Sequence, residues 1–166
     1  MKAVSDATPL MHLAKIGKIY SLKKLFDKII VPKEIYEEVI VKGKELGKNE
    51  VVLIENLIKE KYIIIKEIKS KIEIPNLHEG EGKALALCKE LKIKNLLIDE
   101  KEGFNTAIMF NLIPIRTTSI LIILLDKKII NFNEYKKSLR ELSESGYFLD
   151  AATYERLINV GGGLRK

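Results

Sequence analysis

The segment GEGKALALCKELKIKNLLID, residues 80–99, combines the two patterns that decide the fold. Its first half has apolar residues at helical spacing, which predicts a helix over residues 81–91 with one buried face. Residues 96–98 are an apolar run of strand length, and the run ends at Asp99. A helix followed by a buried strand is the repeating unit of a parallel sheet covered by helices. The segment therefore indicates an α/β fold.

The same alternation extends over the rest of the chain. Strands are expected at residues 3–5, 29–31, 62–66, 96–98 and 113–115, and helices at 8–16, 19–26, 32–41, 50–61, 81–91, 102–111, 118–125 (capped by Thr117 or Thr118), 133–145 and 150–159. Gly43 and Gly47 mark a loop. No linker rich in Pro, Gly or Ser divides the chain, so we expect one domain over residues 1–160. Its last part, 125–160, is a C-terminal helical extension, and residues 161–166 form a flexible tail.

The composition restricts the class of protein. A chain of 166 residues with 46% hydrophobic content can fill one core. The single cysteine, Cys88, excludes an intramolecular disulfide and a Cys-rich zinc site. Met1 leads into an apolar stretch much shorter than that of a signal peptide. The most apolar window, residues 112–125, is interrupted by Pro114 and Arg116 and is shorter than the roughly 20 residues of a membrane span. We expect a cytoplasmic protein with no membrane partner.

The chain is basic, with a formal net charge of +6 and a pI of about 9.2. Such a charge favours a polyanionic partner at long range. A Lys-rich surface can equally reflect a genome-wide or thermophilic composition. The charge is therefore consistent with nucleic acid without establishing it.

The familiar motifs of several enzyme classes are absent. The sequence has no GxxxxGK[ST], GxGxxG, GxSxG or HExxH motif. Its two histidines, His12 and His78, lie at a helical spacing and in a turn, so a structural or solvated role is favoured for both. The acidic residues are the remaining candidates for chemistry.

Two aspartates directly follow expected strands. Asp6 comes after the first apolar run and Asp99 after residues 96–98. The carboxyl ends of parallel strands lie along one rim of the sheet, where such folds bind ligands. Each aspartate could instead only cap the next helix, but two such positions make this reading weaker.

Helical geometry selects one glutamate in the helix expected at 32–41. Ile35 and Val39 define its buried side. Because each residue advances 100°, Glu38 lies about 60° from Ile35, whereas Glu37 points to solvent. Glu38 is therefore the acid near the edge of the core.

The same geometry applies to the helix expected at 81–91. Ala84, Cys88 and Leu91 define its buried stripe, and Glu81 lies within about 60° of that stripe, while Glu79 lies on the opposite face. An inward carboxylate needs a partner, although a first-turn Glu is also favoured by the helix dipole.

Four inward or strand-end acids without a matching set of Arg or His side chains are best explained together by hard divalent cations. Carboxylate oxygens suit Mg²⁺ and Mn²⁺. Such a site orients a water and offsets charge on a phosphodiester transition state. The predicted reaction is metal-dependent hydrolysis, with Asp6, Glu38, Glu81 and Asp99 as metal-binding and catalytic residues.

Four segments resemble the acidic motifs of the PIN-domain ribonucleases, the family that includes the VapC-type toxins. They are VSDATPL (4–10), IYEEV (35–39), GEGKALAL (80–87) and LID (97–99), and Asp99 comes 18 positions after Glu81. The resemblance covers residues 2–125. It implies a three-layer sandwich with a central, mainly parallel five-stranded sheet, metal binding by the same four acids, and an RNA substrate.

The chain departs from the usual VapC pattern at three positions. Its third acid is Glu81 rather than Asp, which resembles a PIN-like subgroup with a GEAEA-type motif. Lys83 replaces the second acid of that motif and is expected to point outward. Thr117 stands where the subgroup usually has Gly; it and the next two residues could bind a water or phosphate at the site, although helix capping is favoured.

The leading functional hypothesis is therefore a Mg²⁺- or Mn²⁺-dependent endoribonuclease, with an antitoxin partner if it is the toxin of a type II toxin–antitoxin pair. The alternative is a non-catalytic module that binds nucleic acid or a partner protein. Aspartyl phosphotransfer ranks third, because Thr8 occupies the position where those folds have a second acid. The last two helices could form a homodimer or inhibitor surface, but packing on their own domain is favoured.

Overall fold

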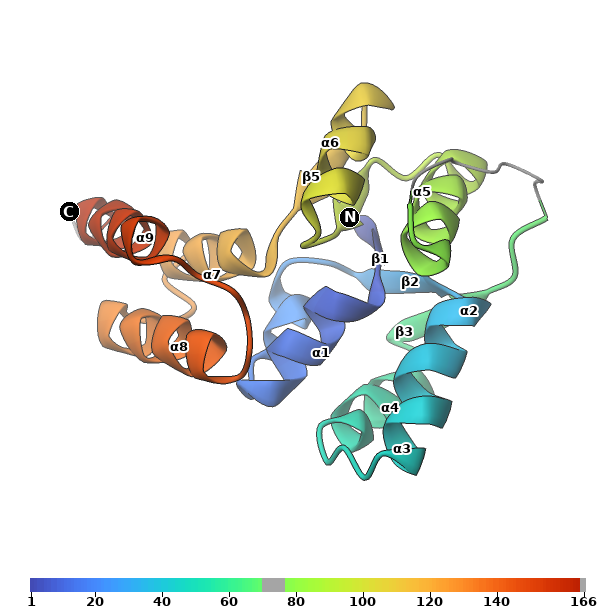
Figure 1. The fold of residues 1–166 in the computed structure, drawn as a ribbon, viewed down its shortest axis with the longest axis horizontal. Helices are drawn as coiled ribbons and strands as arrows, with labels where there is room; N and C mark the ends of the chain where they lie inside the picture. The colour runs from blue at the N-terminus through green and yellow to red at the C-terminus, as the bar shows by residue number, and fades with distance from the viewer. Residues whose placement is uncertain (70–76, 165–166) are drawn as a thin grey trace.

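The computed structural model describes residues 1–69 and 77–164, and five of its strands form one parallel sheet (Figure 1). The strands are β1 (Lys2–Ser5), β2 (Lys28–Pro32), β3 (Ile63–Lys66), β4 (Asn95–Leu97) and β5 (Ile113–Ile115), and their order in the sheet is β3-β2-β1-β4-β5. Val4 of the central strand pairs with Ile30 on one side and with Leu96 on the other. The strands are short, apolar runs that are buried near the middle of the sheet, as expected where helices cover both faces.

Helical segments connect and follow the strands. They are α1 (Ala7–Lys15), the 3₁₀ helix η1 (Ile19–Lys24), α2 (Lys33–Tyr36), the π-helical segment η2 (Glu37–Lys42), α3 (Gly43–Glu45), α4 (Val51–Lys59), α5 (Glu79–Leu91), α6 (Lys101–Met109), α7 (Thr117–Asp126), α8 (Phe132–Glu144) and α9 (Ala151–Gly163).

The direction of the connections explains the three layers. The chain moves outward from β1 to β2 and β3 through α1 and α4, then returns and continues from β4 to β5 through α5 and α6. Parallel crossovers are right-handed, so a reversal of direction places the second pair of helices on the opposite face. The contacts agree, because α1 packs on α4 whereas α5 packs on α6 and on the three central strands. The α/β three-layer sandwich with a five-stranded sheet is thus confirmed, and all of its strand pairs are parallel.

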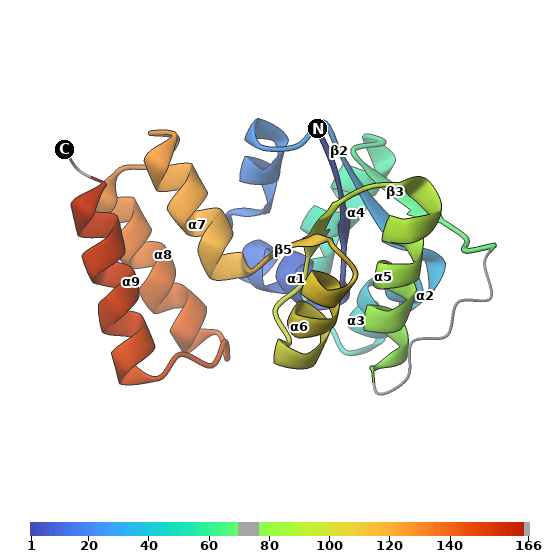
Figure 2. The same cartoon turned by 90° about the horizontal axis from the view of Figure 1, so that it is seen from above.

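The helices α7, α8 and α9 lie together beside the sheet, with α7 next to α1 (Figure 2). Each contacts the other two. The inner face of α8 is buried, with Tyr135 and Leu139 fully covered. The last two helices therefore pack on their own chain, as favoured from the sequence.

The structure corrects the position of two glycine-containing segments. The helical segment that begins at Lys33 does not stop before Gly43. Glycine allows close helix packing there, because a Cβ on Gly43 would lie 2.6 Å from Val51 Cγ2. Likewise α9 continues through the glycines predicted to begin a tail. A Cβ on Gly161 would lie 2.5 Å from Tyr135 Cε1. Residues 165 and 166 of that predicted tail lie outside the described residues.

The remaining differences are local. Residues 19–24 form a 3₁₀ helix rather than an α-helix. Arg116, not a threonine, is the residue before the first turn of α7, and no side-chain cap is formed there. Over the part of the chain that the structure describes, none of the helices has the length and apolar character needed to cross a bilayer.

Candidate metal centre

The direction in which the chain crosses the sheet reverses between β1 and β4. The connections that follow these neighbouring strands leave toward opposite faces, and open α/β sheets bind ligands at such a point. Asp6 directly follows β1, and its backbone amide donates to the carbonyl of Leu97, the last residue of β4, at 2.9 Å. Asp99 comes two residues after that strand. Both aspartates therefore lie at the rim predicted from the sequence.

The carboxyl groups of Asp6 and Glu38 both lie near Gly80, at the start of α5. Asp6 Oδ1 is 3.4 Å and Glu38 Oε2 is 3.6 Å from the position that a Cβ on this glycine would take. The side chain of Asp6 is 4% exposed, whereas Glu38 is exposed. One acid thus forms the floor of the site and the other forms its open edge.

Glu38 lies in the π-helical segment η2 rather than in a regular α-helix. The 100° advance used to predict its direction does not hold there, because a π-helix has more residues per turn. Glu38 is exposed, as Glu37 is, so burial does not separate the two residues as expected, but Oε2 of Glu38 lies near Gly80. Short π-helical segments are frequent at functional sites, where they redirect side chains.

Glu81 is the most deeply buried glutamate of the site, at 3% exposure. Its Oε2 accepts a hydrogen bond from the His78 amide at 3.3 Å, which closes a capping box at the start of α5. Its Oε1 is buried, and no hydrogen-bond partner is found for it among the described residues. Gly103 on α6 faces this oxygen, since a Cβ there would be 3.0 Å from it. The unpaired carboxylate oxygen is the feature of Glu81 that most favours a bound cation.

Asp99 is held by a different set of partners. Its Oδ1 accepts from the Thr117 amide at 2.8 Å and from the Tyr147 hydroxyl at 3.0 Å. Its Oδ2 accepts from Thr117 Oγ1 at 2.7 Å. Thr117 therefore orients an acid instead of capping a helix. Tyr147 was not predicted, because it lies 48 residues away in the connection between α8 and α9, and no local pattern links the two positions.

Burial raises the pKa values of the acids Asp6, Glu81 and Asp99. Burial raises the pKa of Asp6 to about 6, the charges of Glu81 and Glu38 add to the rise, and the amides of Ala7 and Thr8 partly offset it. Burial also raises the pKa of Glu81. The pKa of Asp99 is raised by burial too, despite its hydrogen bonds from Thr117 and Tyr147. A bound cation would reverse these shifts by favouring the ionised forms.

The stability of the metal-free protein should therefore depend on pH. Asp6 has a higher pKa in the folded state than its ordinary 3.8, so the free energy of unfolding falls as pH rises from about 4 to about 6 and stays lower above that range. One pKa unit corresponds to 1.36 kcal/mol, so the loss from Asp6 is roughly 2–3 kcal/mol. Urea unfolding in EDTA at pH 4.5 and 7 measures it. An equal or greater stability at pH 7 would contradict the assigned burial of the carboxyls.

The four acids do not form one tight cluster. Asp6 interacts electrostatically with Glu38 and Glu81, whereas Asp99 is engaged by Thr117 and Tyr147. Within residues 1–69 and 77–164, no three His, Cys, Asp or Glu side chains are placed closely enough to hold a metal ion together. The donor chemistry and the unpaired Glu81 oxygen nevertheless fit Mg²⁺ or Mn²⁺, which bind few protein carboxylates and retain water.

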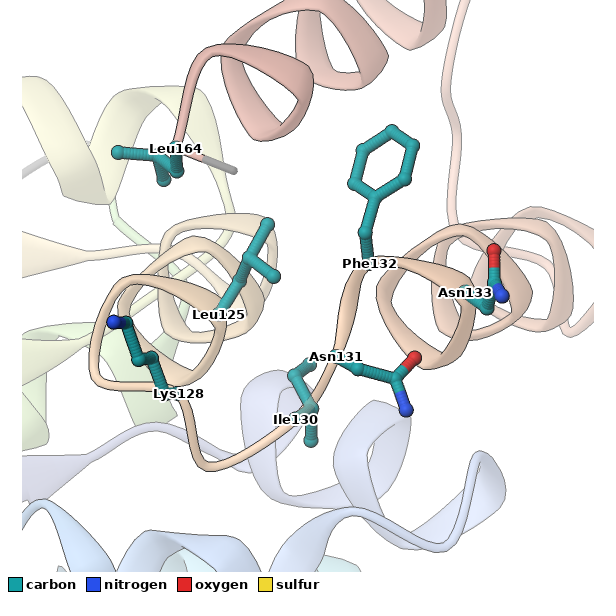
Figure 3. A pocket seen from close by; sticks show the side chains of 7 residues that line it. All are labelled: Leu125, Lys128, Ile130, Asn131, Phe132, Asn133 and Leu164. Carbon is teal, nitrogen blue, oxygen red and sulfur yellow. The ribbon is translucent and has the colours of Figure 1, made fainter. Parts of the chain in front are cut away.

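A separate pocket lies between the ends of α7, α8 and α9 and has a volume of about 380 Å³ (Figure 3). It is lined by Leu125, Lys128, Ile130, Asn131, Phe132, Asn133 and Leu164. None of these side chains is acidic, so the pocket has no part in the carboxylate site.

The family model DUF3368, described as a PIN domain, matches residues 2–162. Among solved structures, the chain is similar to a PilT N-terminus domain protein, SSO1118, from the hyperthermophilic archaeon Sulfolobus solfataricus P2, with a TM-score of 0.53 and 18% identity. The match covers 72% of this chain and 90% of that chain, and at this identity it shows the fold alone. A search of curated proteins finds no match.

Proposed function

Since the chain belongs to the PIN-domain family, whose members are generally metal-dependent nucleases, we propose that it is a Mg²⁺- or Mn²⁺-dependent endoribonuclease. Its metal-binding and catalytic residues would be Asp6, Glu38, Glu81 and Asp99. The observation that carries this proposal is the buried, unpaired Oε1 of Glu81 in a site where Asp6 is also held in an environment that disfavours its charge. Unpaired buried carboxylates are costly, and a divalent cation offsets that cost.

Each acid would have a distinct task. Asp6 and Glu81 would supply buried oxygens to the cation, and Glu38 would supply one from the exposed side. Thr117 and Tyr147 hold the carboxyl of Asp99 in one orientation, as outer partners of metal-binding groups commonly do. A divalent cation supplies Lewis-acid chemistry, because it acidifies water and offsets charge on phosphodiester oxygens. The basic net charge of the chain favours the approach of a polyanion.

The pair Glu37 and Glu38 gives a matched test. Glu38→Gln should reduce manganese-dependent cleavage of a single-stranded RNA by roughly 100-fold, because several kcal/mol of charge stabilisation would be lost. Glu37→Gln removes the same charge from the neighbouring exposed position and should leave the cleavage rate within about twofold of wild type. Cleavage is followed on denaturing gels with manganese and with EDTA. Equal rates for the two variants would remove Glu38 from the site.

The toxin of a type II toxin–antitoxin pair is the finer form of the proposal. It requires an antitoxin partner, so its test is the adjacent gene. A small reading frame with an acidic, DNA-binding-like product, which on co-expression suppresses RNA cleavage, would support the toxin role. If no adjacent product suppresses cleavage, the proposal reduces to a nuclease without an antitoxin.

A second candidate function is a non-catalytic module that binds nucleic acid or a partner protein. It is favoured by the separation of Asp99 from the other acids, since no tight three-ligand cluster exists among the described residues. The cleavage assay distinguishes the two functions. If wild type binds RNA in manganese but does not cut it, the non-catalytic function replaces the nuclease.

A further inference from the structure

A second pocket lies next to Asp99, between the first turn of α6, the start of α7 and the connection from α8 to α9. Its volume is about 750 Å³, which is within the range of small-ligand sites. Asp99 and Thr118 form part of its wall. A ligand in this pocket would therefore lie directly beside Asp99, one of the four proposed metal-binding acids.

Flat groups are among the residues that line the pocket. The Arg116 guanidinium lies 4.5 Å from the centre of the Phe104 ring, and both side chains line the pocket. Phe148 stands at the rim with 87% of its surface exposed. A phenylalanine with this exposure gains little from packing in the isolated chain. Aromatic rings and Arg planes are the surfaces on which unstacked bases of single-stranded nucleic acids stack.

The polar groups of the pocket suit a neutral, hydrogen-bonding ligand. Asn105 offers both a donor and an acceptor, and the buried Nε of Arg116 has no partner among the described residues. Glu100 and Asp150 also line the pocket, and their charges disfavour a phosphate inside it. Lys101 is exposed at the same opening, where a backbone phosphate would pass.

We propose that this pocket is a nucleobase subsite, in which Phe148 and Arg116 hold one base of a single-stranded substrate next to Asp99. The inference rests on the proposed nuclease function, because that function supplies the strand. It assigns a role in substrate binding to the connection between α8 and α9, which also provides Tyr147 to Asp99.

The test measures binding rather than cleavage. A fluorescein-labelled single-stranded RNA is titrated in EDTA, so that no hydrolysis occurs, and anisotropy gives the dissociation constant. Phe148→Ala should weaken binding on the order of tenfold, the loss expected for one stacked base. Phe148→Tyr keeps an aromatic face and should bind like wild type. Met109→Ala removes another exposed apolar side chain, 81% exposed and outside the pocket, and should have no effect.

A set of RNAs with a single abasic position, moved along the strand, makes the test specific. One position should weaken binding to wild type but cause no further loss with Phe148→Ala, because the stacked pair is already broken.

If Phe148→Ala binds all strands like wild type, or if every abasic position has the same effect, the subsite is refuted. If Phe148→Ala binds RNA like wild type and still cleaves it in manganese, the subsite is refuted and the nuclease function is retained. The predicted binding loss without any cleavage by wild type would support the subsite and refute the nuclease.

Discussion

Replacing Asp6 by Asn is expected to lower manganese-dependent RNA cleavage by two to three orders of magnitude. Asp6 is the buried acid at the end of the central strand, and Asn offers a neutral oxygen to the cation in place of a charged one. Roughly 3–4 kcal/mol of lost transition-state stabilisation corresponds to this change in rate. Single-turnover cleavage at saturating manganese measures it.

The same substitution should stabilise the metal-free protein. Burial and the charges of Glu81 and Glu38 raise the pKa of Asp6 to about 6, so its ionised form costs stability at pH 7. Removing the charge should raise the free energy of unfolding in EDTA by roughly 2 kcal/mol. Asp126→Asn, at an exposed position at the end of α7, is the control and should change neither quantity. A loss of activity accompanied by a loss of stability would indicate that Asp6 acts only through the fold.

The second large effect is expected at Gly103. A Cβ there would overlap Cδ1 of Ile98, which is fully buried, and would stand 3.0 Å from Glu81 Oε1. Gly103→Ala should therefore destabilise the protein by about 1–3 kcal/mol, as overpacking does, and should weaken manganese binding through the displaced Glu81. Urea unfolding and a manganese titration measure the two effects.

Gly82 provides the matched control on the facing helix. A Cβ at this position meets nothing within 4 Å, so Gly82→Ala should stabilise α5 by about 0.5–1 kcal/mol and leave manganese binding unchanged. If the two alanine variants had the same stability, the close approach of α6 to Glu81 would not exist in solution.

The fold was predictable because its signals are local. Each buried strand is a short apolar run, and the alternation with helices is sufficient to predict a parallel sheet with helical layers. The same locality explains the errors. Gly43 and Gly161 read as loop and tail residues, but both lie in helices, where their lack of a Cβ allows Val51 and Tyr135 to approach. Such a contact depends on a residue that is distant in sequence, so composition cannot reveal it.

The candidate site was likewise predictable where its signals are local, and not where contacts join distant segments. The direction of Asp6 and Asp99 follows from their place at strand ends, and their strands are neighbours in the sheet. The contacts of Asp99 were not predictable, since Thr117 and Tyr147 come from α7 and from the connection before α9. The assignment of the four acids to a metal ion remains a prediction, which rests on the unpaired oxygen of Glu81 and on the shared electrostatics of Asp6, Glu38 and Glu81.

Isothermal titration of the protein with manganese at pH 7 tests the central proposal most directly. Wild type and Asp126→Asn should show the same saturable binding, and Asp6→Asn and Glu81→Gln should each weaken it by at least about tenfold, because each removes a charged ligand. Binding that is absent from wild type, or unchanged in both ligand variants, would contradict the assignment of these carboxylates to a metal centre.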